Sequence, residues 1–136
     1  MTDLATSMQI SAAGMRVQGT RLRIIAENLA NAGSTAESAE KEPYRRKTLT
    51  FENVLDRSLG VETVRVRRFG EDPSELPRRF EPGHPAADAN GYVATSNVKG
   101  VIEMGDMREA QRSYEANLNV IKSSKAMIEA TIDVLR

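Results

Sequence analysis

The chain has 136 residues, a usual length for one domain, and its 19 Lys and Arg balance its 19 Asp and Glu. This balance removes the electrostatic case for a nucleic-acid partner or an anionic membrane surface. The absence of cysteine excludes disulfides, thiol enzymes and cysteine-based metal sites. No apolar run reaches the roughly 20 residues that cross a bilayer, and the first 30 residues lack the pattern of a secretory signal peptide.

A long amphipathic helix is predicted from about Leu4 to Ala30. Its stripe positions recur at spacings of four and three residues, which places them on one narrow face, as in the seam of a coiled coil. The stripe consists of Leu4, Met8, Ser11, Met15, Gln18, Leu22, Ile25 and Leu29. Asn31 and Gly33 can supply the left-handed residue that ends the helix. Gly14 either lets another helix approach closely or is a tolerated glycine inside a long helix.

The middle of the chain, residues 32–100, predicts loops and short strands without a sizeable core of their own. Residues 32–42 are small or polar and indicate a flexible loop. Extended segments are expected at Tyr44–Phe51, around Val64 and Val66, and at Tyr92–Ala94 after a turn at Asn90-Gly91. Four of the five prolines fall between residues 70 and 85, which excludes a long helix there.

A second helix is predicted from about Val101 to Leu135, roughly 50 Å long at 1.5 Å per residue. Its stripe consists of Met104, Met107, Gln111, Tyr114, Leu118, Ile121, Lys125, Ile128, Ile132 and Leu135. The polar breaks in the two stripes either restrict register and partner choice or lie at the edge of the seam and face water. They are Ser11, Gln18, Gln111 and Lys125.

The predicted fold is therefore mainly α, with two long terminal helices packed as an antiparallel coiled-coil-like hairpin around a small irregular or β middle. We expect three segments: an N-terminal helix (1–31), a middle segment (32–100) and a C-terminal helix (101–136). Apolar side chains in both stripes are expected to pack helices and subunits. The residues in this role are Leu4, Met8, Met15, Leu22, Ile25, Leu29, Met104, Met107, Tyr114, Leu118, Ile121, Ile128, Ile132 and Leu135.

A chemical site is not evident in the sequence. The only histidine, His84, lies between Gly83 and Pro85 and is expected to be a solvated loop residue. Asp88 is near it, but no Ser or Cys nucleophile motif accompanies the pair. Clustered metal ligands and a phosphate-binding loop are also absent from the sequence pattern. We therefore expect no enzyme activity, no cofactor and no metal.

Four groups of segments resemble, in order, the signatures of bacterial flagellar rod and hook proteins. They are Ser11–Met15 with Gln18, Arg21-Leu22 and Ala26–Asn31; Pro43–Lys47; His84-Pro85 with Ala89–Val93 and Ser96–Val98; and Glu103-Met104 with Asp106-Met107, Arg112–Asn117 and Lys125–Met127. The motif residues singled out are Asn28, Leu29, Asn31, Tyr114, Glu115, Ala116 and Asn117. The loop after Asn31 and the stretch Ala94–Ser96 depart from the family pattern without touching either stripe.

The resemblance implies a structural subunit of the proximal rod of the flagellar basal body, which assembles helically through its terminal helices. It would form part of the drive shaft that transmits motor torque to hook and filament. Implied partners are other copies of the chain, other rod proteins, the rod–MS-ring adaptor, the MS ring and the flagellar type III export apparatus, without nucleic acid or a small-molecule substrate. The implied location is the rod, which spans the periplasm.

Two other functions are compatible with the residues alone. A soluble adaptor or export chaperone could use a helical hairpin to bind one helix of a partner. A small hydrolase could use His84 and Asp88. A head-to-tail contact between rod subunits generates an open helical array, whereas an adaptor stays a discrete monomer or dimer.

Overall fold

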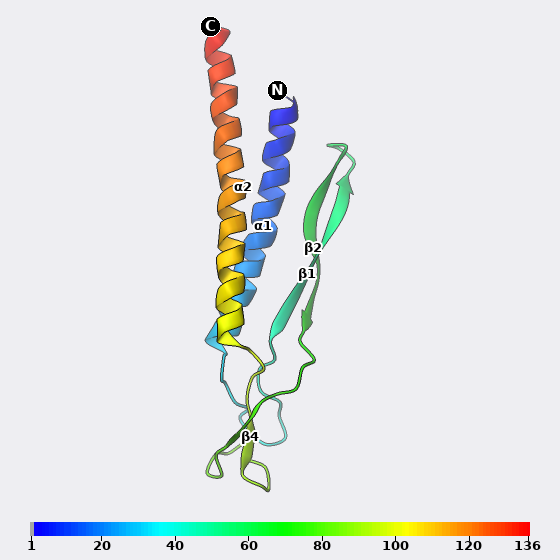
Figure 1. Ribbon diagram of the computed structural model, residues 1–136. Coiled ribbons are helices and arrows are strands. Elements are labelled where there is room, and N and C mark those ends of the chain that lie inside the picture. Colours follow the sequence, from blue (N-terminus) through cyan, green and yellow to red (C-terminus); the bar gives the residue numbers. More distant parts are fainter. Residues whose placement is uncertain (1) are drawn as a thin grey trace. The chain divides into compact units, whose positions relative to one another are not determined.

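A computed structural model describes residues 2–136 of the chain (Figure 1). The elements in order are α1 (Thr2–Ala30), β1 (Lys47–Asp56), β2 (Val61–Glu71), β3 (Arg78–Phe80), β4 (Tyr92–Ala94) and α2 (Gly100–Val134). Two long helices enclose a small β region in the sequence, as predicted. Neither helix, over the range that the structure describes, is long and apolar enough to span a bilayer.

The helix ends agree closely with the sequence prediction, and the strands agree less well. Helix α1 ends at Ala30, and Gly33 adopts the expected left-handed conformation, with φ of +75°. The strand predicted to start at Tyr44 starts at Lys47 and continues to Asp56, five residues further than expected. Strand β3 was not predicted, because three residues are too short for an alternating pattern to emerge.

The chain divides into two compact units that each combine distant parts of the sequence. Unit 1 contains residues 1–22, 49–68 and 107–136, and unit 2 contains residues 23–48 and 69–106. Each long helix therefore contributes to both units.

Unit 1 combines the first part of α1, most of the β1–β2 hairpin and most of α2. The two strands form a two-stranded sheet, and the four residues between them permit only an antiparallel hairpin. The two helices meet where Gly14 faces Asn117, since a Cβ atom on Gly14 would lie 2.7 Å from the Asn117 amide nitrogen. Arg21 pairs with Glu109 across the same helix contact at 3.5 Å. Of the two interpretations of Gly14 that the sequence allowed, the structure therefore supports close approach of another helix.

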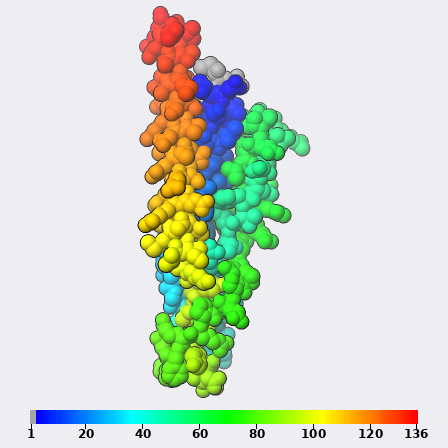
Figure 2. Space-filling view, viewed as in Figure 1, coloured from blue at the N-terminus to red at the C-terminus, as the bar shows by residue number. Residues whose placement is uncertain are grey.

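The buried positions of α2 carry small or polar side chains. Ala110 is fully buried and Ser124 nearly so, and both lie one residue before a predicted stripe position. Gln111 and Lys125, the stripe residues that follow them, are exposed. Small side chains such as these let the backbones of two helices approach each other. The larger stripe side chains of α2 then lie at the sides of the contact between the helices. Figure 2 shows the atoms of α2, orange to red, uncovered on the viewed face.

Unit 2 contains the short β3–β4 sheet and the irregular segments beside it. The two strands are antiparallel, with Arg79 opposite Val93, and an isolated bridge joins Thr35 to Thr95. Val93 is fully buried and packs with Ala36 and Ala86 in a small apolar core. This core is too small to hold the unit together alone, so its polar contacts carry much of the structure.

Gly14 and Gly19 provide a matched pair of substitutions within α1. Gly19→Ala should raise the free energy of unfolding by about 0.5–1 kcal/mol, because a Cβ there meets nothing within 4 Å and Ala favours the helix. Gly14→Ala should lose this gain, since the new methyl displaces the Asn117 amide from its bond to the Ser113 carbonyl. Urea unfolding at high protein concentration, where association between copies orders the helices, measures both variants.

The double variant Gly14→Ala/Asn117→Ala tests the cause. Shortening Asn117 removes the collision, so the coupling energy between the two substitutions should be favourable. Equal stability gains for Gly14→Ala and Gly19→Ala would contradict the close contact.

Candidate functional site

A cluster of interlocked polar side chains lies within unit 2. It contains Asn28, Tyr44, Arg46, Asp72, Asn97, Glu103 and Asp106, and we call it the polar cluster. Its members come from the end of α1, the two segments that flank the β1–β2 hairpin, the segment before α2 and the first turns of α2. The cluster therefore joins parts of the chain that are up to 78 residues apart in sequence.

Asn28 is the centre of the cluster and is 1% exposed. Its amide nitrogen donates to the Lys47 carbonyl at 3.0 Å and to a Glu103 carboxylate oxygen at 3.3 Å. Its oxygen accepts from the Tyr44 hydroxyl at 2.7 Å and from the Lys47 backbone N–H at 2.9 Å. Both donor hydrogens and both acceptor positions of the amide are used, so a hydrophobic residue or an aspartate could not replace it.

Glu103 is a fully buried carboxylate at the start of α2. It accepts hydrogen bonds from Asn28 and from the Arg46 guanidinium. Arg46 also pairs with Asp106 at 3.3 Å and with Asp72 at 3.8 Å. A buried charge without partners costs several kcal/mol, so Arg46 makes the position of Glu103 possible.

The ionisable groups of the cluster respond to burial and to their partners. Burial disfavours the charged Arg46, but its bond to Glu103 and the nearby carboxylates raise the pKa of Arg46 above its ordinary value. Burial raises the pKa of Tyr44, which keeps its hydroxyl a donor to Asn28. Hydrogen bonds from the Ser74 hydroxyl and N–H lower the pKa of Asp72. The stability that Asp72 contributes is present above the ordinary carboxyl pKa and is lost as the pH falls through the lowered pKa.

Asn97 extends the cluster to the segment after β2. Its oxygen accepts from the Arg46 backbone N–H at 2.7 Å. Its nitrogen donates to the carbonyls of Asp72 at 3.1 Å and Ser74 at 3.3 Å. The Arg45 side chain donates to the same two carbonyls. These bonds satisfy backbone groups in a segment without regular structure, which fixes its path.

The groups of the polar cluster bond mainly to one another, an arrangement suited to holding chain segments in place. Sequence reasoning selected only Asn28 of these residues as a motif residue. Tyr44, Arg46, Asn97 and Glu103 lie in segments that resemble the flagellar rod and hook signatures, yet their roles were missed. The position of these polar residues inside the family-like segments was a sign that they matter. Their contacts with one another could not be predicted, because local sequence patterns do not show which residues distant in sequence meet in the fold.

The stripe residues of α1 are all buried or half-buried. Ser11 and Ile25 are buried, and the others are half-buried. On α2, Met107, Tyr114, Leu118, Ile121 and Ile128 are half-buried. Met104, Ile132 and Leu135 are exposed in the single chain, at 54%, 43% and 81%. Their packing against neighbouring subunits stays a prediction.

The remaining motif residues occupy different positions. Asn31 donates its amide to the Glu27 carbonyl at 2.8 Å and so helps to end α1. Asn117 is half-buried and packs against Gly14. Glu115 and Ala116 are exposed, as expected for side chains outside the contact between α1 and α2.

His84 is not the solvated loop residue that the sequence indicated. It is half-buried, its Nε2 lies 3.0 Å from the Thr35 hydroxyl, and its Nδ1 accepts from the Ala86 N–H at 2.9 Å. Asp88 instead pairs with Arg78, and hydrogen bonds led by the Tyr92 N–H lower the pKa of Asp88. The structure does not bring His84 and Asp88 together as a catalytic pair. Within residues 2–136, no group of three or more His, Asp or Glu side chains is placed to hold a metal ion.

Removing Arg46 should harm the protein more than removing its buried partner. Arg46→Met leaves the Glu103 carboxylate buried without a cation and should cost about 3–5 kcal/mol of unfolding free energy. Glu103→Gln should cost less, because Arg46 keeps Asp72 and Asp106. Arg65→Met is the control: it breaks an exposed pair with Glu52 and should cost less than about 1 kcal/mol. Equal losses for Arg46→Met and Arg65→Met in denaturant unfolding would refute the role of the cluster.

Comparisons with known proteins extend the resemblance to the whole chain. A family model described as flagellar basal body rod FlgEFG protein C-terminal matches residues 89–134. The flagellar basal-body rod protein FlgC of Agrobacterium fabrum is 48% identical over 100% of this chain and 98% of its own length. The proteins of the same name from Salmonella typhimurium and Borreliella burgdorferi are 37% and 34% identical, over at least 95% of both chains. The chain therefore belongs to the FlgC family of flagellar basal-body rod proteins.

Proposed function

We propose that this structural subunit of the flagellar basal-body rod assembles helically through its terminal helices, and that the assembly forms part of the shaft that transmits motor torque to hook and filament. The similarity over nearly the full length of several rod proteins carries this proposal. An adaptor or export chaperone is not favoured, because these relatives are named as rod proteins.

We propose further that the two helices form an antiparallel coiled-coil-like hairpin within one subunit. In unit 1, Gly14 faces Asn117 and Arg21 pairs with Glu109. In unit 2, Asn28 bonds to Glu103. The partner number on α2 falls as the number on α1 rises, and this order supports an antiparallel pair. Apolar side chains such as Leu22, Ile25 and Leu29 would contribute to this contact.

The uncovered side of α2 is the proposed surface for neighbouring subunits. Val120, Met127 and Val134 are exposed by 43%, 55% and 85% and follow one another at intervals of seven residues. Such spacing places them along one line of the helix, which a second helix could cover. Met104, Ile132 and Leu135 would be covered in the same assembly.

The partners proposed for this subunit are other copies, the other rod proteins, the rod–MS-ring adaptor and the MS ring. Its route would be export through the flagellar type III apparatus, a proposal that its membership of a flagellar rod family supports. Electron microscopy of basal bodies from cells carrying a tagged copy tests the proposal. Density for the tag on the rod is the expected result, and a tagged chain found only as a free monomer or dimer would overturn it.

A charge placed in the half-buried face of α2 should abolish swimming. Leu118→Asp or Ile121→Asp puts a carboxylate among apolar neighbours, at a cost of several kcal/mol repeated in every copy. Asn53→Asp is the matched control, because it adds the same charge at an exposed position of β1, outside α2. His84→Ala should leave motility nearly intact. Soft-agar assays at normal protein levels decide this, and a non-motile His84→Ala strain would revive a catalytic role.

The terminal helices should be weakly ordered in dilute monomer. Most helical stability comes from packing an apolar face, and Ala110 and Ser124 are the only buried residues of α2 after Met107. Ordering each residue costs about 1–2 kcal/mol, which so little burial does not offset until neighbours cover the helix. Amide exchange should therefore show weak protection over residues 4–22 and 107–134. Strong protection in the monomer would disprove this.

A further inference from the structure

The turn that leads into β4 contains an asparagine followed by a glycine, Asn90-Gly91, and this pair occurs once in the chain. An asparagine is chemically labile because the backbone nitrogen of the next residue can attack its side-chain amide. A side chain on that next residue hinders the attack, and glycine has none. The other six asparagines are followed by Leu, Ala or Val. Asn90 is therefore the asparagine most open to this reaction.

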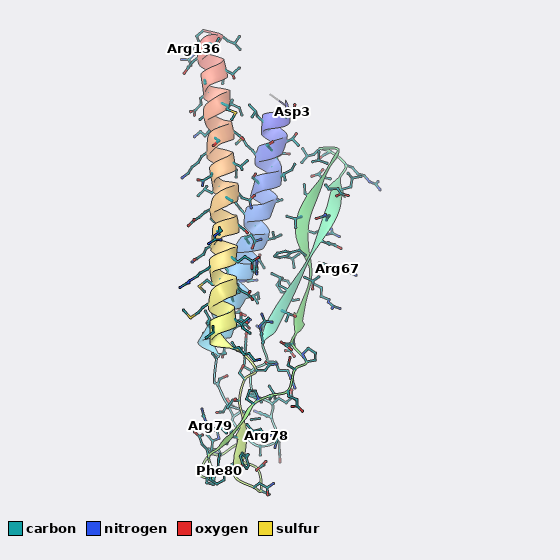
Figure 3. The ribbon with its side chains drawn as sticks, in the orientation of Figure 1. Asp3, Arg67, Arg78, Arg79, Phe80 and Arg136 are labelled. Atoms are coloured by element: carbon teal, nitrogen blue, oxygen red, sulfur yellow. The ribbon has the colours of Figure 1, made fainter. Side chains whose placement is uncertain are left out.

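The fold of unit 2 requires a glycine at position 91. Gly91 has a φ of +85°, a conformation that residues with a side chain rarely adopt. A Cβ atom there would lie 2.9 Å from the Phe80 ring and 3.1 Å from Pro82. Figure 3 shows the labelled Phe80 on β3, where its ring meets that of Tyr92 edge to face at 5.3 Å. The turn therefore cannot replace its glycine by a bulkier residue that would protect Asn90.

Asp88 holds this turn closed, and we call residues 88–92 the Asp88 turn. A carboxylate oxygen of Asp88 accepts from the backbone N–H groups of Asn90 and Tyr92, both at 2.9 Å. The Asp88 carbonyl accepts from the Gly91 N–H at 3.0 Å. Gly91 is buried, whereas Asn90 is exposed. The nitrogen that would attack therefore has its proton engaged in a hydrogen bond, and the turn must open before this nitrogen can react.

We propose that Asn90 is a latent deamidation site, which the Asp88 turn protects in the folded chain and which reacts when the turn is open. The Gly91 nitrogen then forms a bond to Asn90 Cγ. The side-chain amide leaves as ammonia and takes up the proton that the Gly91 nitrogen loses, so the product is a cyclic imide. Water opens either C–N bond of the imide ring and leaves aspartate or isoaspartate in place of the asparagine. Water is the only other reactant.

Either product disturbs the strand pair that follows the turn. An aspartate in place of Asn90 adds a carboxylate close to that of Asp88, and like charges repel. An isoaspartate adds a carbon atom to the main chain, so the N–H groups of the turn can no longer all meet Asp88. Val93, which is fully buried one residue after the turn, then loses its fixed position. Because the ammonia is lost, the change is not reversed and marks chains that have spent time with the turn open.

Mass spectrometry of the full chain, incubated at neutral pH in buffer and in urea, tests the proposal. In urea, Asn90 should lose its amide faster than any of the other six asparagines. In buffer, the loss at Asn90 should be at least about tenfold slower, since the rate follows the fraction of chains in which the turn is open. Equal rates at Asn90 in the two solutions, or a faster loss at another asparagine in urea, would overturn the proposal.

Substitutions of Asp88 test its part in the protection. Asp88→Ala removes both side-chain bonds to the turn and should speed the loss at Asn90 in buffer by about tenfold or more, because bonds to a charged acceptor are strong. Asp88→Asn keeps an acceptor oxygen and should react within about threefold of the unmodified chain. Asp56→Ala is the matched control: it removes the same kind of bonds, to the N–H groups of Ser58 and Leu59 in another turn, and should change the rate at Asn90 by less than about twofold.

The pattern across the variants decides the outcome. An unchanged rate in Asp88→Ala, or an equal acceleration in Asp88→Ala and Asp56→Ala, would refute the role of Asp88. If Asp88→Ala unfolds unit 2 and reacts in buffer as fast as in urea, slow loss in Asp88→Asn still supports the proposal, and equally fast loss in both refutes it. In urea all variants should react alike, so an acceleration by Asp88→Ala that persists there would contradict protection by the fold.

Discussion

The buried pair of Glu103 and Arg46, held by Asn28, is the interaction on which unit 2 depends. The Glu103 carboxylate at the start of α2 is fully buried, and burying such a group without a cation and hydrogen-bond donors costs several kcal/mol. Arg46 supplies the cation from the segment before β1, and Asn28 supplies a donor from the end of α1. Three distant parts of the chain must therefore arrive together, or the charge remains unpaired.

This dependence accounts for a unit with very little apolar core. The apolar cluster beside β3 and β4 consists of alanines and one valine, which contribute little free energy on burial, and further buried apolar residues of the unit are Ile24, Ile25 and Val98. Polar bonds do not add much net stability, but a missing partner costs a great deal. The polar cluster thus selects one arrangement of the loops, and exposed pairs such as Arg65 with Glu52 lack this selectivity.

The sequence predicted the two helices well because their signals are local. Four-and-three spacing and a glycine near the helix end suffice to place α1 and α2 within about two residues. The position of buried residues on α2 was less predictable. The hydrophobic pattern predicted that Met104 would be buried, whereas the structure buries Glu103 beside it. Burial of Glu103 is possible because Arg46, from another segment, compensates the charge of its carboxylate. The role of His84 was missed for a similar reason, since its partner Thr35 lies 49 residues earlier.

The β1–β2 hairpin has a consequence for how the protein behaves before it assembles. A two-stranded sheet leaves the outer backbone edges of both strands unpaired, and such edges invite other chains to add strands and aggregate. Stacking identical hairpins in parallel register would place Arg67 on Arg67 and Arg68 on Arg68, at about 4.8 Å from strand to strand. Repulsion between like charges at that spacing opposes fibre growth. The arginines therefore disfavour amyloid-like stacking of identical hairpins, while the backbone edges of the two strands stay open.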